Sequence, residues 1–520
     1  MARQKSENRI VPKGRGNAVP TRRKKTTTGG KAVPVNQEER QLALFPETAE
    51  KPAKAGPDGK AARSRERAAM RAGPKSGHKR GRVDPATIES VSERLLEAFE
   101  NVARNRGAPG PDGQTIEELR EHIGDLLPEL RLALLEDRYQ PGNIRRKWID
   151  KAGGGRRGLG IPDVIDRMAQ EAVRLVLEPL YEPTFHSSSH GFRPGRSCQT
   201  AIAEAEKHIK DGHEWVVDID LEKFFDQVNH QRLMSRLAER ISDKRLLKLI
   251  GRMLKAKTIL PDGVIVSTDE GVPQGGPLSP LLSNIVLDEL DRELERRGHR
   301  FVRYADDANI YVKSERAGRR VMESVTSFIE RRLRLKVNES KSGVARPEER
   351  HFLGFSLRYE PLDGSVEVLL SPRTRKRVYA KILELTPRNW GGSLDACISG
   401  INSYLRGWIG FFGICTDGAE RTLNGVDAHI RRRLRAIQLK HWKRKKTIAR
   451  KLMEFGVRRK TAWRTVYGGR GSLWALSHTN AVNRALCNSH WEKRGLFSLL
   501  KSWRFTQEQI AAQIQLKLIQ

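Results

Sequence analysis

The spacing of apolar residues divides the chain into three regions. Large apolar side chains are sparse over residues 1–80, where Gly, Pro, Ser, Thr, Lys and Arg dominate, so this segment is predicted to be disordered. From Asp84 and Pro85, a pair typical of a helix start, apolar residues recur at helical spacing to about residue 145. The first of them are Val91, Leu95, Leu96 and Phe99. A globular region is therefore expected to begin near residue 86.

The middle of the chain changes to a strand pattern at two places. Residues 216–230 read VVDIDLEKFFDQVNH, a β-branched run that ends at Asp220 and is followed by polar and aromatic residues at helical spacing. Residues 301–314 read FVRYADDANIYVKS, two strand-like runs on either side of Asp306 and Asp307. The simplest geometry is a β-hairpin with both aspartates at its tip, where neither carboxylate is buried without a partner. Paired aspartates are also common in ordinary turns, so this motif alone leaves a purely structural role open.

A glycine-rich loop lies between these two segments. Residues 271–284 read GVPQGGPLSPLLSN, in which Pro273 stiffens the entry and Gly275 and Gly276 leave the backbone accessible to a ligand. After Pro280, apolar residues return at helical spacing, which predicts a helix. Such a loop is often only a connector. Its position between two carboxylate-bearing segments favours a functional role.

Helical spacing returns in the C-terminal third of the chain. Over residues 394–412 the apolar positions fall on one face of a helix, which predicts core packing. These positions are Cys397, Ile398, Ile401, Leu405, Trp408, Ile409 and Phe412. Residues 429–460 then hold 14 Lys and Arg with one Glu, a net charge of +13 in 32 residues. A charged run is usually a solvated helix face, but so dense a run repels itself unless phosphates lie nearby.

The overall charge narrows the class of partner. The formal net charge of +34 exceeds what solubility requires and indicates a polyanion, most often nucleic acid, with an anionic membrane surface as the rival. No apolar run approaches the roughly 18 to 20 residues of a membrane span, and the N-terminus lacks the apolar core of a signal peptide. The protein is therefore predicted to be cytoplasmic, without a membrane partner. The four cysteines are scattered and contain no C-x-x-C pair, so neither a disulfide framework nor a zinc site is expected.

Three carboxylates could converge if the strand that ends at Asp220 lies beside the hairpin that carries Asp306 and Asp307. Carboxylates packed together repel one another unless a hard cation lies between them, and Mg²⁺ bound by carboxylates and substrate phosphates is the expected occupant. Two such ions, roughly 3.5 to 4 Å apart, can activate an attacking 3′-hydroxyl and stabilise the leaving pyrophosphate. The pattern therefore predicts a nucleotide polymerase.

Together these motifs resemble the palm of a reverse transcriptase and, more narrowly, the group II intron-encoded reverse transcriptase/maturases. The palm motifs are DLEKFFD (220–226), PQGGPLSP (273–280) and YADD (304–307). Further blocks that resemble the family, in the same order along the chain, are RGAPGPDG (106–113), RRGLGIP (156–162), SHGFRPGRS (189–197), LKVNESKS (335–342) and FLGF (352–355). Each block has modest specificity, but the whole series in this order is very improbable by chance. The resemblance covers almost everything after residue 85.

The resemblance implies roles for single residues. Asp220, Asp306 and Asp307 match the family's catalytic and metal-binding positions. The positions that match its nucleotide-binding residues are Lys151, Arg157, Phe225, Gln274 and Lys341. Phe225 matches an aromatic ring that crowds the sugar 2′ position and favours deoxynucleotides, although a core phenylalanine is the alternative. Lys151 and Arg157 match cations that hold the triphosphate, and the glycines between them read as a hairpin turn.

The C-terminal third also carries family motifs. Residues 404–413, YLRGWIGFFG, resemble the maturase-specific or X region, which supplies the polymerase thumb and contacts with intron RNA. Residues 470–491 resemble the DNA-binding tail of the short bacterial class associated with group IIC introns. No Cys-pair or His-rich module follows Trp503, so an endonuclease domain is expected to be absent, and a primer would come from elsewhere. The basic residues predicted to contact nucleic acid are Arg431, Arg432, Arg435, Lys443 and Arg444.

The predicted fold class is α+β: a right-hand polymerase with an antiparallel sheet in its fingers and palm, a helical thumb and a small basic helical C-terminal domain. The predicted bounds are 1–85 for a basic disordered arm, 86–370 for fingers and palm, 371–440 for the thumb and maturase-specific region, and 441–520 for a basic DNA-binding region. The predicted function is that of an RNA-directed DNA polymerase encoded by a group II intron, which copies intron RNA into cDNA and acts as a maturase in splicing. The expected cofactors and partners are two Mg²⁺ ions, dNTPs, an RNA template with a DNA primer, the intron RNA and a DNA target. A splicing-only maturase, and a reverse transcriptase of another retroelement or of host defence, stay open as alternatives.

Overall fold

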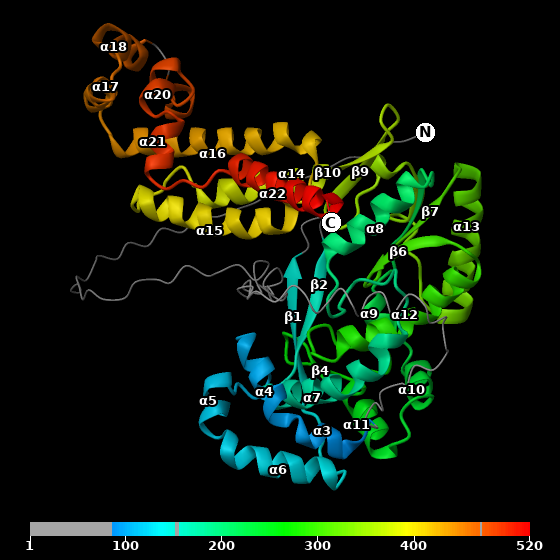
Figure 1. The fold of residues 1–520 in the computed structure, drawn as a ribbon. Helices are drawn as coiled ribbons and strands as arrows, with labels where there is room; N and C mark the ends of the chain where they lie inside the picture. The colour runs from blue at the N-terminus through cyan, green and yellow to red at the C-terminus, as the bar shows by residue number, and fades with distance from the viewer. Residues whose placement is uncertain (1–85, 151–154, 469–470, 520) are drawn as a thin grey trace, which may run out of the picture. The chain divides into compact units, whose positions relative to one another are not determined.

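A group of helices opens the part of the chain that the structure describes, which comprises residues 86–150, 155–468 and 471–519 of a computed structural model (Figure 1). The predicted arm at 1–85 lies outside these residues. The helices of this group are α3 (Ile88–Glu93), α4 (Leu95–Arg104), α5 (Ile116–Glu121) and α6 (Ile123–Leu135). Thr87 caps the first of them by accepting a hydrogen bond from the Ser90 amide, which satisfies a helix-end donor.

The predicted apolar face of these first helices is largely confirmed. Val91, Leu95 and Phe99 are buried, with exposed fractions of 1% or less. Leu96 was predicted on the same face and this was wrong, because its side chain is 53% exposed. It immediately follows Leu95 and therefore points about 100° away from the buried stripe.

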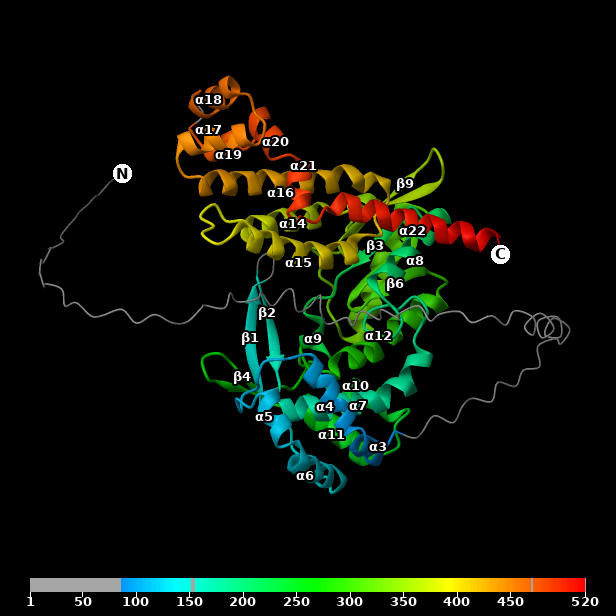
Figure 2. The ribbon, with the colours of Figure 1, turned by 60° about the vertical axis from the view of Figure 1, so that its left-hand side comes forward.

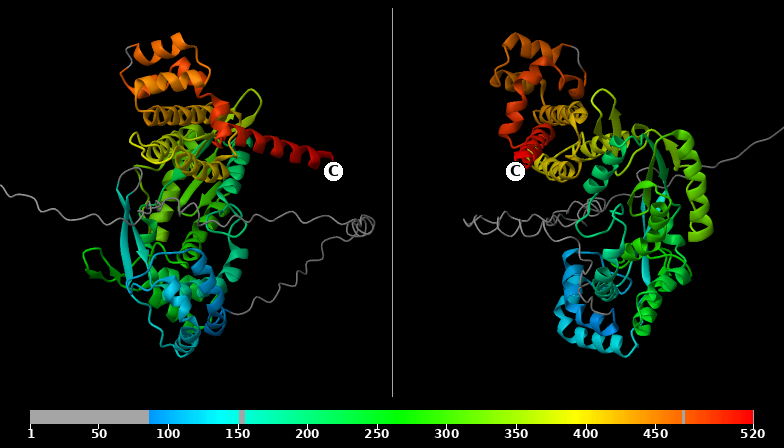
Figure 3. Two further views of the ribbon diagram at one scale, coloured as in Figure 1. Left: turned by 90° about the vertical axis from the view of Figure 1, so that its left-hand side faces the viewer. Right: turned by 45° about the vertical axis from the view of Figure 1, so that its right-hand side comes forward.

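A four-stranded sheet in the order β2-β1-β4-β5 follows. Its strands are β1 (Ile144–Asp150), β2 (Arg156–Ile161), β4 (Thr258–Ile259) and β5 (Ile265–Val266). Strands β1 and β2 form a long antiparallel hairpin with Asp150 opposite Arg156 (Figure 3). This pairing confirms the hairpin predicted around the glycines, although residues 151–154 of its turn lie outside the described residues.

The second four-stranded sheet, in the order β6-β7-β3-β8, is antiparallel throughout. Its strands are β3 (Trp215–Ile219), β6 (Arg300–Tyr304), β7 (Asp307–Val312) and β8 (Gly343–Ala345). Successive residues of a strand face opposite sides, and Val216 and Val217 accordingly join two different apolar cores. Helix α13 (Glu315–Phe328) packs with Val217, whereas α8 (Cys198–Lys210) packs with Val216 (Figure 1). The sheet is therefore covered on both faces, and its strand ends carry the accessible chemistry.

Further helices complete the apolar core that contains Val217 and the N-terminal helices. They are α7 (Val164–Tyr181), α9 (Phe224–Gln227), α10 (His230–Ala238), α11 (Lys244–Leu254) and α12 (Ser279–Arg296). Helix α12 is the one predicted after the glycine-rich loop, and all four of its predicted apolar positions are buried. Those positions are Leu281, Leu282, Ile285 and Leu290.

The hairpin of β9 (Phe355–Glu360) and β10 (Ser365–Leu370) leads into three helices that contact one another (Figure 2). These are α14 (Pro372–Leu385), α15 (Leu394–Phe412) and α16 (Glu420–His441). The predicted apolar face of α15 is buried from Cys397 to Ile409, and Phe412 at its end is partly buried. The periodicity over residues 394–412 thus predicted both the helix and its packing.

Several short helices and a final longer helix follow α16 and share its apolar core. They are α17 (Lys445–Glu454), α18 (Arg459–Tyr467), α19 (Leu473–Leu476), α20 (Asn480–Ala485), α21 (Asn488–Lys493) and α22 (Leu499–Ile519). Trp491 and Trp503 anchor this end of the core with exposed fractions of 3% or less. The predicted boundaries near residues 370 and 440 stay predictions, because one continuous apolar core extends across both. Within the described residues, no helix is both long enough and apolar enough to cross a membrane.

Candidate active site

The register of the palm sheet brings the three predicted carboxylates to one end of neighbouring strands. Strand β3 pairs with β7 so that Ile219 lies opposite Ala308. One further step in this antiparallel register sets Asp220 opposite Asp307. Asp306 occupies the two-residue turn that joins β6 to β7. Three side chains separated by as many as 87 positions in sequence thus meet at one strand edge.

The hairpin was predicted correctly, but the position of one aspartate within it was not. Both aspartates were expected at the tip, whereas the structure pairs Asp307 with Tyr304 as the first residue of β7. The turn proper is Ala305 and Asp306, and Ala305 adopts a left-handed backbone with φ 57°. A two-residue turn with positive φ suits the twist of a tight hairpin. Asp307 is consequently held by the strand ladder, while Asp306 projects from the turn.

A buried arginine supports this turn from behind. Arg303, which is 1% exposed, donates hydrogen bonds to both carboxylate oxygens of Asp291 at 2.7 and 2.5 Å. The same guanidinium donates to the carbonyl oxygen of Ala305 at 2.9 Å, to Asn284 Oδ1 at 3.0 Å and to Ser189 Oγ at 2.7 Å. Because every bond is fully enclosed by protein, this network fixes the turn rigidly.

Gly191, from the SHGFRPGRS block, packs directly against the same turn. A Cβ atom at Gly191 would lie 2.2 Å from the backbone nitrogen of Ala305, which is impossibly close for two non-bonded atoms. The carbonyl oxygen of Gly191 accepts a hydrogen bond from Asn284 Nδ2 at 2.9 Å. Glycine is therefore required there because the backbone of one motif touches the backbone of another.

The carboxylates interact electrostatically. Desolvation, followed by repulsion from Asp306, Asp218 and Asp220, raises the pKa of Asp307 to about 7. Asp307 keeps solvent-accessible surface at the strand end, so the desolvation reflects protein crowded around its other sides. Desolvation also raises the pKa of Asp306, against a lowering by the positive charge of Arg157. The protein therefore concentrates negative charge at this strand end, where neighbouring carboxylates repel one another.

Asp218 is a fourth member of this cluster that the sequence analysis did not single out. Desolvation raises its pKa to about 6, with Arg350 opposing and Asp220 adding to the shift. Asp218 and Asp220 lie two residues apart, so the strand's period of two places them on the same face. The spacing D-I-D in VVDID was the available signal.

Lys341 holds Asp220 in the structure. Its Nζ lies 3.1 Å from each carboxylate oxygen of Asp220, and the lysine side chain remains 59% exposed. The Ser342 hydroxyl receives the Asp220 amide hydrogen bond at 3.0 Å, and the Asn338 amide donates to the Asp220 carbonyl at 2.8 Å. The LKVNESKS block is thus the segment that positions Asp220.

The donor set fits a divalent cation such as Mg²⁺ in chemistry. All candidate ligands are carboxylate oxygens, which hard cations prefer, and their mutual repulsion would be relieved by a cation among them. The described residues nevertheless contain no group of three or more His, Cys, Asp or Glu side chains already arranged around a metal position. In this arrangement Asp220 is paired with Lys341.

The glycine-rich loop connects the palm edge to the β1–β2 hairpin. The Gly160 amide of β2 donates to the carbonyl oxygen of Gln274 at 2.7 Å. A Cβ at Gly275, whose φ is +121°, would lie 2.4 Å from the Gly160 carbonyl oxygen, so only glycine permits this contact. On its other side the loop bonds to α9, since the Val272 amide donates to the Phe225 carbonyl at 2.6 Å. Gln274 and Phe225 are thereby held close to each other, and both are partly exposed.

The structure describes one of the two side chains that were predicted to bind the triphosphate. Arg157 is an exposed residue of β2, and its charge reaches Asp306 strongly enough to lower that carboxyl's pKa. Lys151 lies outside the described residues. Phe225 contacts Phe224 edge to face with ring centroids 5.2 Å apart, and Phe224 alone is fully buried. Phe225 is thus available at the surface while its neighbour belongs to the core.

The predicted nucleic-acid-binding residues of the C-terminal region fall into two groups. Lys443 and Arg444 are exposed where α16 gives way to α17. Arg431, Arg432 and Arg435 instead line a pocket on α16, and Arg435 is only 8% exposed. Arg435 Nε donates to the Ser477 carbonyl at 3.0 Å, so this residue also has a structural role.

Comparison with known families shows the family to which the chain belongs. Residues 149–357 match the family described as "Reverse transcriptase (RNA-dependent DNA polymerase)", and residues 375–455 match "Group II intron, maturase-specific domain". The chain belongs to the group II intron-encoded reverse transcriptases. It is therefore an RNA-directed DNA polymerase with a maturase region, and the family uses divalent metal ions. The maturase match favours an intron-encoded protein over the predicted alternative of a reverse transcriptase from another retroelement or defence system.

Individual relatives agree with this family. The chain is 33% identical over 350 residues to Protein YkfC of Escherichia coli, covering 59% of this chain and 88% of that protein. It is 29% identical over 420 residues to the group II intron-encoded protein LtrA of Lactococcus lactis, covering 62% and 68%. Among solved structures, a chain of a partial Cas6-RT-Cas1–Cas2 complex is 26% identical, covering 46% of this chain and 43% of that one. Its TM-score of 0.30 is too low to support a functional comparison.

Proposed function

We propose that Asp220, Asp306 and Asp307 hold two Mg²⁺ ions and that this reverse transcriptase extends a DNA primer on an RNA template with dNTPs. The observation that carries this proposal is the sheet register, which sets Asp220 opposite Asp307 with Asp306 in the adjoining turn. Bound Mg²⁺ would lower the pKa of the primer 3′-hydroxyl and neutralise the leaving pyrophosphate. Asp218 supports the site through its charge, because it lies on the same strand face as Asp220.

The remaining site residues bind and orient the nucleotide. Arg157, together with Lys151, would hold the triphosphate through charge-assisted hydrogen bonds. Lys341 forms an ion pair with Asp220. Once Asp220 binds a metal ion, the lysine would be released and could bind a phosphate. Gln274 would lie beside the incoming nucleotide, on a loop fixed by its backbone bond to β2.

The proposed partners follow from the maturase match and from charge. Group II intron RNA is the proposed RNA partner, copied into cDNA and stabilised for splicing, and a DNA target is the proposed destination. Lys443 and Arg444 offer exposed positive charge for phosphate contacts. The proposed compartment is the bacterial cytoplasm. The proposed division into an arm, fingers and palm, thumb and basic C-terminal region keeps the bounds given above.

Selection of deoxynucleotides tests the nucleotide site. Replacing Phe225 with Ala removes the ring proposed to crowd the sugar 2′ position, so incorporation of ribonucleotides relative to deoxynucleotides should rise at least about 10-fold, a difference of about 1.4 kcal/mol. Primer extension with each nucleotide type measures this ratio. Phe224→Leu is the matched control, because the neighbouring ring is buried in the core and its change should leave the ratio unaltered. An unchanged ratio in Phe225→Ala would assign Phe225 to packing alone.

A further inference from the structure

A basic pocket of about 780 Å³ lies between α16 and the short helices that follow α19. Its positive side is formed by Arg431, Arg432 and Arg435 of α16. Its other side includes Asn483 and Cys487. None of the side chains that line it in the described part of the chain is acidic. None of the described residues that line the pocket belongs to the carboxylate cluster.

The three guanidinium groups in this pocket are close enough to repel one another. Desolvation, together with the charges of Arg431 and Arg432, lowers the pKa of Arg435 to about 10. Arginine is held in such a cluster at a cost in free energy unless an anion binds. The described lining side chains carry positive charge and no negative charge, as expected of a site that binds an anion.

Aromatic and backbone contacts hold two of these arginines in place. The guanidinium carbon of Arg432 lies 3.9 Å from the ring centroid of Trp474, a close cation–π contact. Arg435 is fixed by the bond from its Nε to the Ser477 carbonyl, which uses one of five donors. Preorganised arginines of this kind match the oxygen atoms of a phosphate group.

The pocket also offers polar atoms that no other described group satisfies. Asn483 Oδ1 and His429 Nε2 are buried without a hydrogen-bond partner, as is Arg432 Nε. His429 also lines the pocket, and desolvation, with the nearby arginines, lowers its pKa, so its ring is neutral at pH 7. An asparagine amide and a neutral imidazole can read the polar edge of a base. The volume, within the roughly 300 to 1,000 Å³ of ligand sites, also exceeds what a lone phosphate needs.

We propose that this pocket binds an unpaired nucleotide of a nucleic-acid strand, with its phosphate held by Arg431 and Arg435 and its base edge read by Asn483 and His429. A paired base keeps its hydrogen-bonding edge inside the duplex, so a pocket whose lining residues read that edge selects a base that is free of a partner. The inference deepens the proposed nucleic-acid binding and is independent of the polymerase chemistry.

Cys487 provides a local probe of this pocket. It is the partly exposed cysteine of the chain, whereas Cys198, Cys397 and Cys415 are buried. Its hydrogen bond with Ser489, at 3.1 Å, lowers the pKa of the thiol and favours its reaction with iodoacetamide. A nucleotide in the pocket should block the reagent. Strands bound away from the pocket should leave Cys487 accessible, so the readout reports on this site.

The experiment measures the alkylation rate of Cys487 by mass spectrometry in the full-length protein, without dNTPs or divalent ions. Single-stranded DNA and single-stranded RNA pentanucleotides of mixed sequence form two arms, and at least one should slow the reaction 5-fold or more. A blunt duplex and inorganic phosphate should each slow it less than 2-fold. The Cys487→Ser variant confirms that the signal comes from this thiol. Comparing the two single-stranded arms tells whether the bound strand is RNA or DNA.

Two matched variants complete the test. Arg431→Gln should raise the concentration of pentanucleotide needed for half-protection at least 10-fold. Arg421→Gln, an exposed arginine of the same helix outside the pocket, should change it less than 2-fold. Equal protection by the duplex or by phosphate alone, or an unchanged half-protection concentration in Arg431→Gln, would overturn the proposal. Because no polymerisation is involved, a failure of primer extension would leave this result unaffected.

Discussion

Asp307 is the carboxylate whose surroundings most strongly disfavour its charged form. Its pKa is about 7 in the folded protein against an ordinary value of 3.8, so the folded state retains a proton that the unfolded chain releases between these values. The contribution of Asp307 to the free energy of unfolding should therefore fall as pH rises from about 4 to 7. A site that destabilises the fold in this way is expected where function requires concentrated charge.

Replacing Asp307 with Asn should stabilise the protein at pH 8. The uncharged amide removes the repulsion, and a gain on the order of 1 to 2 kcal/mol in the free energy of unfolding is expected after allowing for solvent screening of a partly exposed group. Urea unfolding in EDTA at pH 8 measures the gain, and it should disappear at pH 4. The exposed Asp269 serves as control through Asp269→Asn, which should change stability little at either pH. A gain of equal size at both pH values would contradict this account.

The buried Arg303 and Asp291 make a second prediction for single residues. Arg303→Leu leaves the Asp291 carboxylate, which is fully buried, without its ion-pair partner, so a loss of about 3 to 5 kcal/mol in the free energy of unfolding is expected. The double variant Arg303→Leu/Asp291→Leu should recover most of this loss. Urea unfolding compares the two, and a double variant no more stable than the single one would show that the ion pair is not the cause.

At the residue scale, sequence motifs identified the three central aspartates but not their supports. Asp218, Arg303 and the Lys341–Asp220 ion pair depend on which strands lie side by side, and strand order cannot be read from a local pattern. Arginine is seldom fully buried, so the pattern FVRY gives no sign that Arg303 is enclosed by protein. Its burial follows from Asp291, which lies on α12 twelve residues earlier.

At the element scale, periodicity predicted α12 and α15 and the β6–β7 hairpin because each has an unbroken apolar pattern. It placed Asp307 at the hairpin tip instead of on β7, because polar residues mask the first pairing position of a strand. Positive φ at Ala305 allows a two-residue turn made of Ala305 and Asp306, so Asp307 falls on the strand. Residue type gives little warning of this, since alanine seldom adopts that backbone.

The contact between the SHGFRPGRS block and the hairpin turn makes a prediction at this scale. Gly191→Ala places a Cβ within 2.2 Å of the Ala305 backbone, so the turn must move and the position of Asp306 with it. Primer extension should fall at least about 10-fold, since small displacements of catalytic groups are costly. Gly251→Ala on α11 is the control, because a Cβ there meets no atom within 4 Å, and it should retain activity. Full activity in Gly191→Ala would show that the turn tolerates displacement.

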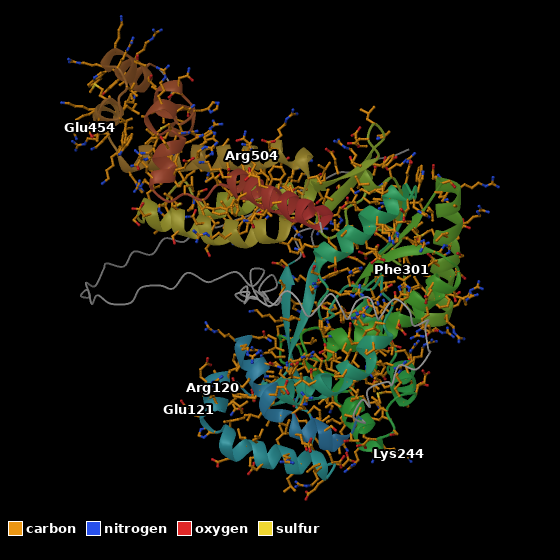
Figure 4. The ribbon with its side chains drawn as sticks, in the orientation of Figure 1. Arg120, Glu121, Lys244, Phe301, Glu454 and Arg504 are labelled. Atoms are coloured by element: carbon orange, nitrogen blue, oxygen red, sulfur yellow. The ribbon has the colours of Figure 1, made fainter. Side chains whose placement is uncertain are left out.

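At the scale of the whole molecule, motifs scattered from residue 156 to residue 342 converge on one strand edge. The glycine-rich loop bonds to β2 and α9, the LKVNESKS block holds Asp220, and Gly191 supports the turn. Net charge predicted a nucleic-acid partner correctly in kind, but it could not distinguish exposed cations from those enclosed in a pocket. In Figure 4, Glu454 on α17 lies among many side chains that end in nitrogen. The net charge counts every such cation equally, so it does not tell which of them bind nucleic acid.

The most direct test is Mg²⁺-dependent extension of a DNA primer on an RNA template by the native chain and by Asp306→Asn. The native protein should synthesise cDNA only when Mg²⁺ is present, and Asp306→Asn should reduce the rate at least about 1,000-fold, or about 4 kcal/mol of transition-state stabilisation. Asp226→Asn, an exposed carboxylate of the same DLEKFFD segment that pairs with Arg146 at 3.4 Å, should retain native activity. Absence of cDNA from the native protein would instead identify a splicing-only maturase, and full activity in Asp306→Asn would contradict the proposed metal site.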